Sequence, residues 1–174
     1  PRRRQDVDFI FMAAFPRQAR LIAPQLRFHH AADIPVYTTS HAYNGSESVQ
    51  ENRDMNGVII CDSTWILTNI TEADPLRKQL QQIWPQSMTE YARLYALGLD
   101  DYNLLAQKKW HKSNPNEVYD GVTGQLYIDL DRKIQRTLKW GQFNNGTITM
   151  LPDISKPKDD ITDGGNPPQL QISQ

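Results

Sequence analysis

The sequence has little of several features that would narrow its function at once. It contains one cysteine, so an internal disulfide is impossible, and the position of Cys61 in an apolar run predicts a buried, unreactive thiol. Its apolar runs are far shorter than the roughly 18–20 residues that a membrane-spanning helix needs. A net charge of −1 provides no overall field that would recruit nucleic acid. We therefore expect no nucleic-acid partner and no membrane span.

The motifs of common enzymes are also absent. The sequence contains no Gly-x-Ser-x-Gly, no His-Glu-x-x-His, no phosphate-loop consensus and no Cys-x-x-Cys. Asp129 and Asp131 alternate along a predicted strand and could form a metal or acid pair, but no third ligand is close in sequence. An aspartate at position 131 suits a turn instead. The sequence predicts no catalytic residue, no metal and no cofactor.

The most informative stretch that is present is residues 6–40. The near-continuous apolar run at 7–14 predicts a strand covered on both faces. Pro16 suits the first turn of a helix, and the apolar residues after it recur at helical spacing. A β-branched and aromatic run at 34–39 predicts a second strand. A strand, helix and strand with short connections predict parallel strands and a right-handed crossover.

The middle of the chain continues this α/β pattern. We expect a third buried strand at 57–62 and a helix at 71–84. A second helix is expected at 89–97, where Gly98 ends or kinks it, followed by another helical segment at 100–110. The expected apolar stripe of the first of these helices consists of Leu76, Leu80 and Ile83.

The last third changes character. Alternating side chains predict a strand at 121–131 and a partner strand at 132–143, with a short turn near Asp131. Residues 152–174 are rich in Pro, Asp, Gly, Lys and Gln and lack apolar periodicity, which predicts a flexible or loosely packed tail. The sequence thus divides into one α/β domain over 1–151 and this tail.

A candidate ligand crevice follows from the predicted sheet. Ligands of open parallel sheets bind outside the carboxyl ends of the strands, and aromatic, cationic, hydroxyl and carboxylate groups follow each of the three strands here. An ordinary set of loop and helix-capping residues would look the same, so both interpretations stay open. The candidate cleft residues are Phe15, Arg17, Gln18, Ser40, His41, Asp62 and Trp65.

The order of the elements resembles the later half of a type I periplasmic binding protein, from residue 6 to about 151. Three runs resemble a narrower family more closely: Phe-Met-Ala-Ala-Phe-Pro-Arg-Gln-Ala-Arg-Leu-Ile at 11–22, Ile-Pro-Val-Tyr-Thr-Thr-Ser-His at 34–41 and Cys-Asp-Ser-Thr-Trp at 61–65. They are similar to the C-terminal domain of the LppC-type lipoproteins, which activate class A penicillin-binding proteins.

The resemblance implies parallel-sheet lobes of a type I periplasmic-binding-protein-like fold, as a fragment of the full two-lobed domain, with apolar stripes left exposed where the other half would pack. It implies a noncatalytic regulator of peptidoglycan synthesis that contacts the synthase. It also implies a periplasmic protein attached to the outer membrane by a lipid anchor outside this chain, because Cys61 is not a mature N-terminal cysteine. The alternative is a solute-binding lobe that captures a small polar ligand such as an amino acid or a glycan fragment.

Overall fold

The protein is a mixed α/β structure, seen in a computed structural model that describes residues 6–45, 48–68, 75–89, 91–106, 118–129 and 131–152. A five-stranded sheet has the order β1-β2-β3-β7-β8, and a separate three-stranded sheet has the order β4-β5-β6. The strands are β1 (Ile10–Met12), β2 (Val36–Thr38), β3 (Ile59–Asp62), β4 (Tyr119–Asp120), β5 (Gln125–Ile128), β6 (Ile134–Thr137), β7 (Lys139–Asn144) and β8 (Thr147–Met150). The α-helices are α1 (Pro16–Phe28), α2 (Val49–Asn52), α3 (Thr64–Leu67), α4 (Pro75–Ile83) and α5 (Ala92–Ala106), with short 3-10 turns at Ser40–Ala42, Arg53–Met55 and Pro85–Met88.

The strand–helix–strand unit predicted at the start of the chain is confirmed. β1 and β2 are parallel, with Ile10 opposite Val36, and β2 and β3 are parallel as well. Pro16 begins α1, as expected for a residue with a fixed φ at the first helical position. Ala19 and Ala23 of α1 are fully buried in the hydrophobic core, so small side chains allow this helix to lie close to the sheet.

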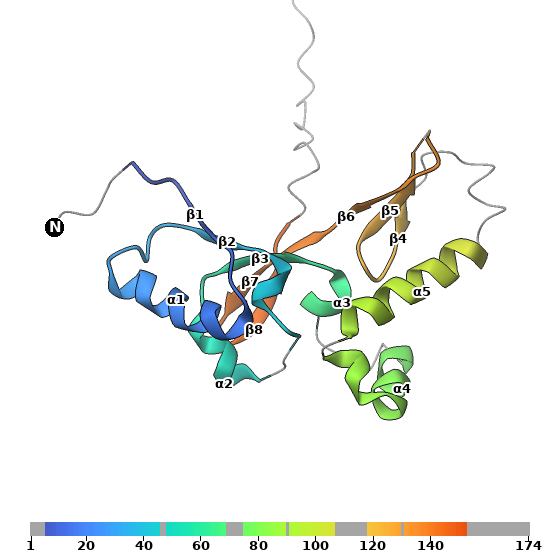
Figure 1. Ribbon diagram of the computed structural model, residues 1–174, viewed down its shortest axis with the longest axis horizontal. Coiled ribbons are helices and arrows are strands. Elements are labelled where there is room, and N and C mark those ends of the chain that lie inside the picture. The colour runs from blue at the N-terminus through green and yellow to red at the C-terminus, as the bar shows by residue number, and fades with distance from the viewer. Residues whose placement is uncertain are drawn as a thin grey trace, which may run out of the picture.

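Figure 1 shows how these elements are arranged: α1 and α2 lie on one face of the five-stranded sheet, and α4, α5 and the three-stranded sheet lie at the other end of the molecule. The core of the sheet is formed where β3 meets β7, with Ile60 and Phe143 fully buried. Because β3 and β7 are antiparallel, the parallel part of the sheet ends at β3.

The expectation that the first strand is covered on both faces is wrong. β1 is an edge strand, and Phe9 and Phe11 beside and within it are 58% and 62% exposed. The apolar run was correct as a strand signal, but in the described part of the chain no element packs on the face that these two rings occupy.

The expected helix end at Gly98 is wrong, whereas the alternative that Gly98 kinks the helix stays a prediction. One helix, α5, runs through Gly98 without interruption, and residues 107–110 of the predicted second segment lie outside the described residues. A glycine in a helix interior costs only about 1 kcal/mol relative to alanine. The buried positions Ala92, Ala96, Asp100 and Leu104, spaced four residues apart, hold both halves of α5 against the protein.

The predicted hairpin of the last third forms, with one difference. Ile128 pairs with Ile134, so β5 and β6 are the predicted partners, but the second predicted strand divides after Thr137 and continues as β7 in the larger sheet. The short turn lies at Asp131 as expected, and the carboxylate of Asp129 accepts the backbone N–H of Lys133 at 2.8 Å.

The β7–β8 hairpin turns at Asn145 and Gly146, both with positive φ, as a type I′ hairpin turn requires. Within the described residues, no helix combines the length and apolarity needed to cross a membrane. Residues 153–174 of the predicted tail, like residues 71–74 of the predicted helix start, lie outside the described residues.

Candidate functional site

The carboxyl ends of the three parallel strands meet at one edge of the sheet, as the sequence predicts. The Thr38 hydroxyl at the end of β2 donates a hydrogen bond to the Met12 carbonyl at the end of β1, at 2.7 Å. Just beyond, the rings of Phe15 and His41 meet edge to face with centroids 6.2 Å apart. Two of the predicted cleft residues are therefore in contact.

The carboxylate of Asp62 at the end of β3 is buried and bound by Arg93 of α5. The Arg93 Nε lies 3.2 Å from each carboxylate oxygen, and its Nη2 donates to the same group. That Nη2 also donates to the backbone carbonyls of Ser40 and Tyr43, at 2.8 and 2.9 Å. Asp62 therefore fastens α5 to the strand ends, and Ser40 takes part through its backbone.

Arg93 is a residue that the sequence analysis missed. The sequence does show a charged residue in an otherwise apolar segment, and a buried charge needs an oppositely charged partner. That partner, Asp62, lies 31 residues away along the chain, so local spacing did not reveal it. Removing one member of such a pair leaves a buried charge uncompensated, so this contact holds the edge of the sheet in one arrangement.

Trp65 lies inside the protein, only 3% exposed, at the start of the short helix α3. The guanidinium of Arg77 stacks on its ring, 4.6 Å from the centroid, and Nη2 of Arg77 donates to the Trp65 carbonyl at 2.7 Å. Nη1 of the same arginine donates to the Thr68 carbonyl at 3.1 Å. Trp65 therefore packs with α4.

The other predicted cleft residues face solvent. Arg17 and Gln18 lie in the first turn of α1, and Phe15, just before that turn, is 66% exposed. His41 is exposed as well. The structure thus separates the seven candidates into four exposed residues, a buried pair formed by Asp62 and Trp65, and the partly buried Ser40. Their role as ligand-cleft residues stays a prediction.

A second buried carboxylate, Asp100, holds α5 from its middle. Its oxygens accept the backbone N–H groups of Val122 and Thr123 at 2.9 and 2.8 Å, and the Thr123 hydroxyl as well. A side chain at position 121 would reach within 2.6 Å of this carboxylate, so Gly121 is required for the close approach. α5 is thereby tied to the turn between β4 and β5.

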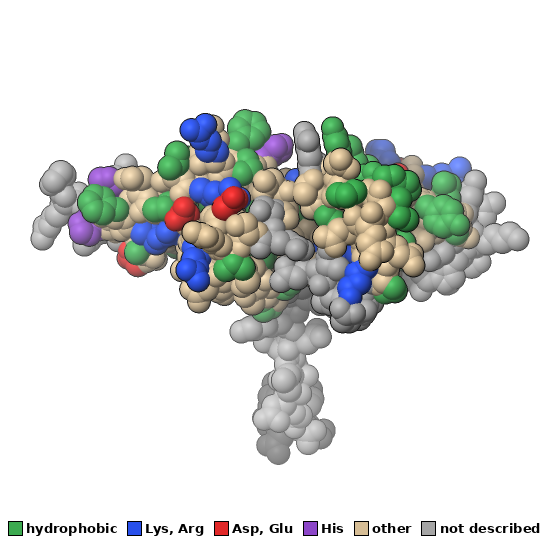
Figure 2. All heavy atoms as spheres, turned by 90° about the horizontal axis from the view of Figure 1, so that it is seen from below, with side chains coloured by type: hydrophobic (Ala, Val, Ile, Leu, Met, Phe, Trp, Pro, Cys, Tyr) green, Lys and Arg blue, Asp and Glu red, His purple; other side chains and the backbone are tan. Residues whose placement is uncertain are grey.

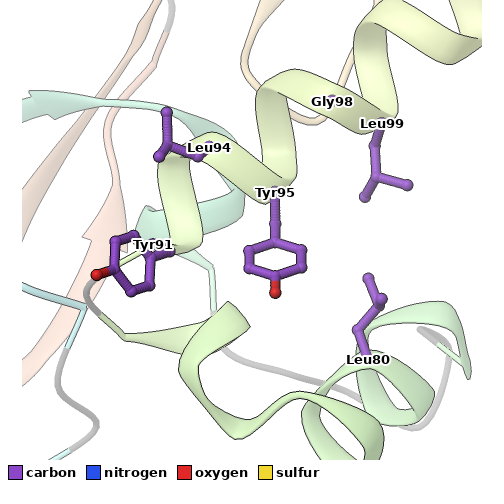
Figure 3. A pocket seen from close by; sticks show the side chains of 6 residues that line it. All are labelled: Leu80, Tyr91, Leu94, Tyr95, Gly98 and Leu99. Atoms are coloured by element: carbon purple, nitrogen blue, oxygen red, sulfur yellow. The ribbon is translucent and has the colours of Figure 1, made fainter.

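An apolar groove of about 450 Å³ lies between α4 and α5. Figure 3 shows Tyr95 and Leu99 of α5 pointing toward α4, from which Leu80 points back. Tyr91, Leu94 and Gly98 complete the lining. None of the described residues that line the groove is charged, so the groove differs in kind from the polar edge of the sheet.

Within the described ranges, no three His, Cys, Asp or Glu side chains are grouped so that they could hold a metal ion. Asp129 instead accepts hydrogen bonds from the Gln135 side chain at 2.7 Å and from the Lys133 backbone, and these bonds lower the pKa of its carboxyl. Its geometry is that of a turn residue.

Comparison with known proteins places this arrangement in a family. The family described as "LppC putative lipoprotein" matches residues 1–146. Among similar sequences, the penicillin-binding protein activator LpoA of Vibrio vulnificus is 32% identical over 143 residues, which is 80% of this chain and 23% of that protein. LpoA of Vibrio cholerae is 30% identical over 142 residues, again 23% of its length. This chain therefore spans about a quarter of the length of these relatives.

Solved structures agree on the fold. The C-domain of LpoA from Haemophilus influenzae, described as a regulator of PBP1A, superposes with a TM-score of 0.67 at 21% identity, over 86% of this chain and 46% of that one. A "putative branched-chain amino acid ABC transporter" from Chromobacterium violaceum superposes with a TM-score of 0.52 at 30% identity, over 78% of this chain and 42% of the other. The α/β fold predicted from the sequence is confirmed, and the chain belongs to the LppC lipoprotein family.

Proposed function

We propose that this chain is part of a noncatalytic regulator of peptidoglycan synthesis that activates a class A penicillin-binding protein by direct contact. The observation that carries the proposal is the family match over residues 1–146, together with relatives that are named activators of a penicillin-binding protein. The relatives are about four times as long as the matched segment, so the activity belongs to the whole protein to which such a domain contributes.

The strand-end geometry supports a scaffold rather than an enzyme. A general acid or base needs a carboxyl that can reach a substrate. Asp62 is instead buried and saturated by Arg93 and by the backbone N–H of Ser63, at 2.7 Å. Asp100 is equally occupied by its three donors. These two carboxylates hold elements together.

We further propose that the protein acts in the periplasm and is held at the outer membrane by a lipid anchor outside this chain. The support is the lipoprotein family itself. Cys61 is the single cysteine of the sequence and lies within β3, so it is a strand residue and not the mature N-terminal cysteine that carries the lipid of a lipoprotein.

The test uses a chimera, because this chain matches only part of an activator. Residues 1–146 replace the matched segment of Vibrio vulnificus LpoA, and the glycan polymerisation rate of a purified class A penicillin-binding protein is measured with the chimera, with native LpoA and with LpoA lacking the segment. We expect the chimera to raise the rate as native LpoA does. A well-folded chimera that raises the rate no more than the deleted protein does would refute the proposal.

A second candidate, a solute-binding lobe, is favoured by the likeness to the Chromobacterium violaceum protein. The exposed group Phe15, Arg17, Gln18 and His41 would supply an aromatic and cationic rim for a small polar ligand. Thermal stability measured across a panel of amino acids and muropeptides tests it. A ligand-dependent rise in melting temperature that Arg17→Gln abolishes would support this candidate, and no rise with any ligand would remove it.

A further inference from the structure

The chain contains three Asn-Gly pairs, and the structure holds them in different ways. An asparagine before glycine is prone to deamidation, because glycine has no side chain to hinder attack by its own backbone nitrogen. In this reaction the glycine nitrogen bonds to the asparagine Cγ, the Cγ–Nδ2 bond breaks, and the proton of the glycine N–H leaves with the amide as ammonia. Water then opens the succinimide ring to aspartate or isoaspartate. The pairs are Asn44-Gly45, Asn56-Gly57 and Asn145-Gly146.

Two kinds of contact in a folded protein slow this attack. A glycine N–H that donates a hydrogen bond to a carbonyl keeps its proton and its orientation. A side-chain amide that is held by a partner cannot turn toward the glycine nitrogen. Where either contact exists, the protein must open locally before the reaction, and the rate falls with the small population of the open state.

The Asn56-Gly57 pair is held at both residues. The Gly57 N–H donates to the Phe143 carbonyl at 2.8 Å. The side-chain Oδ1 of Asn56 accepts the backbone N–H of Asn145, also at 2.8 Å. Nη1 of Arg27 donates to the Asn56 carbonyl at 2.9 Å. Both the nucleophile and the amide that it would attack are therefore fixed.

The segment just before this pair is fastened to α1 as well. Nη1 of Arg20 lies 2.8 Å from Oε2 of Glu51 in α2, and Nη2 of Arg27 donates to the Asp54 carbonyl at 3.0 Å. Figure 2 shows basic and acidic side chains next to each other over the part of the molecule that α1 and α2 form. Opening the chain at Asn56 would disturb these contacts, which adds to the protection.

The Asn145-Gly146 pair is exposed at its asparagine but rigid in its backbone. Asn144 and Thr147 pair on either side of it, and the Asn145 N–H is bound as described above. Gly146 is buried, and a Cβ added to it would lie 2.1 Å from the Val49 carbonyl oxygen, so its backbone packs directly against α2. The turn therefore resists the change of shape that ring closure requires.

The Asn44-Gly45 pair lies in a different setting. Residues 43–45 belong to neither a helix nor a strand, and Asn44 is exposed. Among the described residues no backbone carbonyl accepts the Gly45 N–H. Arg77 and Gly45 line the same cavity of about 20 Å³. A guanidinium close by favours the negative charge that develops on the attacking nitrogen and on the amide oxygen.

We propose that Asn44 is the site at which the folded chain deamidates, whereas Asn56 and Asn145 are protected by their contacts. The product carries one more negative charge, which changes the net charge from −1 to −2 (−1 minus 1). In its isoaspartate form it also adds one backbone atom between α2 and Tyr43, whose carbonyl Arg93 binds. The proposal is independent of synthase activation.

The test follows the three pairs separately. The chain is incubated in mildly alkaline buffer, once folded and once in urea, and is then digested with trypsin, which places the pairs on three peptides, 28–53, 54–77 and 140–158. Mass spectrometry measures the deamidated fraction of each peptide, and labelling by an isoaspartyl methyltransferase identifies isoaspartate.

We expect peptide 28–53 of the folded chain to react within about threefold of its rate in urea, and the other two peptides to react at least about tenfold more slowly than in urea. Asn44→Gln is the matched control, because the longer side chain disfavours ring closure without changing the charge. It should abolish the modification of peptide 28–53 and leave the other two rates unchanged.

Three outcomes would overturn the proposal. In the first, Asn56 or Asn145 reacts in the folded chain as fast as Asn44. In the second, peptide 28–53 reacts in urea but stays unmodified in the folded chain. In the third, Asn44→Gln leaves the modification of peptide 28–53 intact, which would place the reaction at another residue.

Discussion

Asp100 allows a quantitative test of how α5 is held. Its carboxylate accepts three hydrogen bonds, from the backbone N–H groups of Val122 and Thr123 and from the Thr123 hydroxyl. Asp100→Asn replaces one oxygen with an NH₂ group, so at least one donor then faces another donor. Leaving a buried donor unpaired costs about 1–3 kcal/mol, and the other two bonds lose roughly 1 kcal/mol each when the acceptor becomes neutral. The expected loss of unfolding free energy is about 3–5 kcal/mol.

Urea and thermal unfolding measure this loss. A chain of this size loses roughly 2–4 °C in melting temperature per kcal/mol, so Asp100→Asn should melt about 6–20 °C lower. The matched control is Asp101→Asn, the adjacent and exposed carboxylate of the same helix, which should change stability by less than about 0.5 kcal/mol. Equal stabilities for the two variants would refute the assignment of Asp100 as the anchor.

A double-mutant cycle adds a geometric check on the same contact. Gly121→Ala places a methyl group 2.6–2.8 Å from the Asp100 carboxylate, so we expect it to destabilise the wild-type chain. In an Asp100→Ala background the obstructing atoms are absent, and the same substitution should cost markedly less. Additive effects of the two substitutions would show that the close approach is incorrect.

Three further predictions follow from local geometry. Gly146→Ala should destabilise the protein more than Gly57→Ala. Both glycines have positive φ, but an added Cβ at position 146 would overlap a backbone carbonyl oxygen of α2, whereas one at position 57 meets no atom within 4 Å. Equal urea midpoints for the two variants would contradict this prediction. Hydrogen bonds from Gln135 and the backbone lower the pKa of Asp129, so its contribution to stability is present above the unfolded carboxyl pKa of about 3.9 and is lost as the pH falls toward the folded pKa. Asp129→Asn should therefore show a flatter loss of stability between pH 5 and pH 2, measured by urea titration. Burial, reinforced by the neighbouring carboxylate, raises the pKa of the Cys61 thiol, so iodoacetamide should modify it more slowly in the folded chain than in the urea-unfolded chain at pH 8.5.

The parts of the fold that local pattern determines could be predicted from the sequence. The apolar run before Pro16, the proline itself and the β-branched run after α1 each point to one element, and those elements form in the expected order. The common edge of the strand ends followed from parallel pairing alone. Phe15 and His41 meet there because both directly follow strands that are paired.

What could not be predicted depends on contacts between distant residues. Arg93 and Asp62 are 31 residues apart in the sequence, and Asp100 and Thr123 are 23 residues apart. Neither contact follows from a local sequence pattern. Burial likewise depends on contacts with residues that are distant in the sequence. The stripe that includes Leu76 is correctly periodic, but periodicity identifies an apolar face without saying which polypeptide covers it.

The pairing of β3 with β7 has a consequence for the order in which the protein assembles. Ile59 lies opposite Gln142, so this pair closes a loop of 83 residues (142 minus 59). By the logarithmic dependence on loop length, closing it costs about 4 kcal/mol of chain entropy, more than any neighbouring hairpin in the sheet. Helices α4 and α5 and the β4–β6 sheet all lie within that loop. We therefore expect the intervening elements to form first and the central strand pair to close late, which makes the joining of β3 to β7 the slow step of folding.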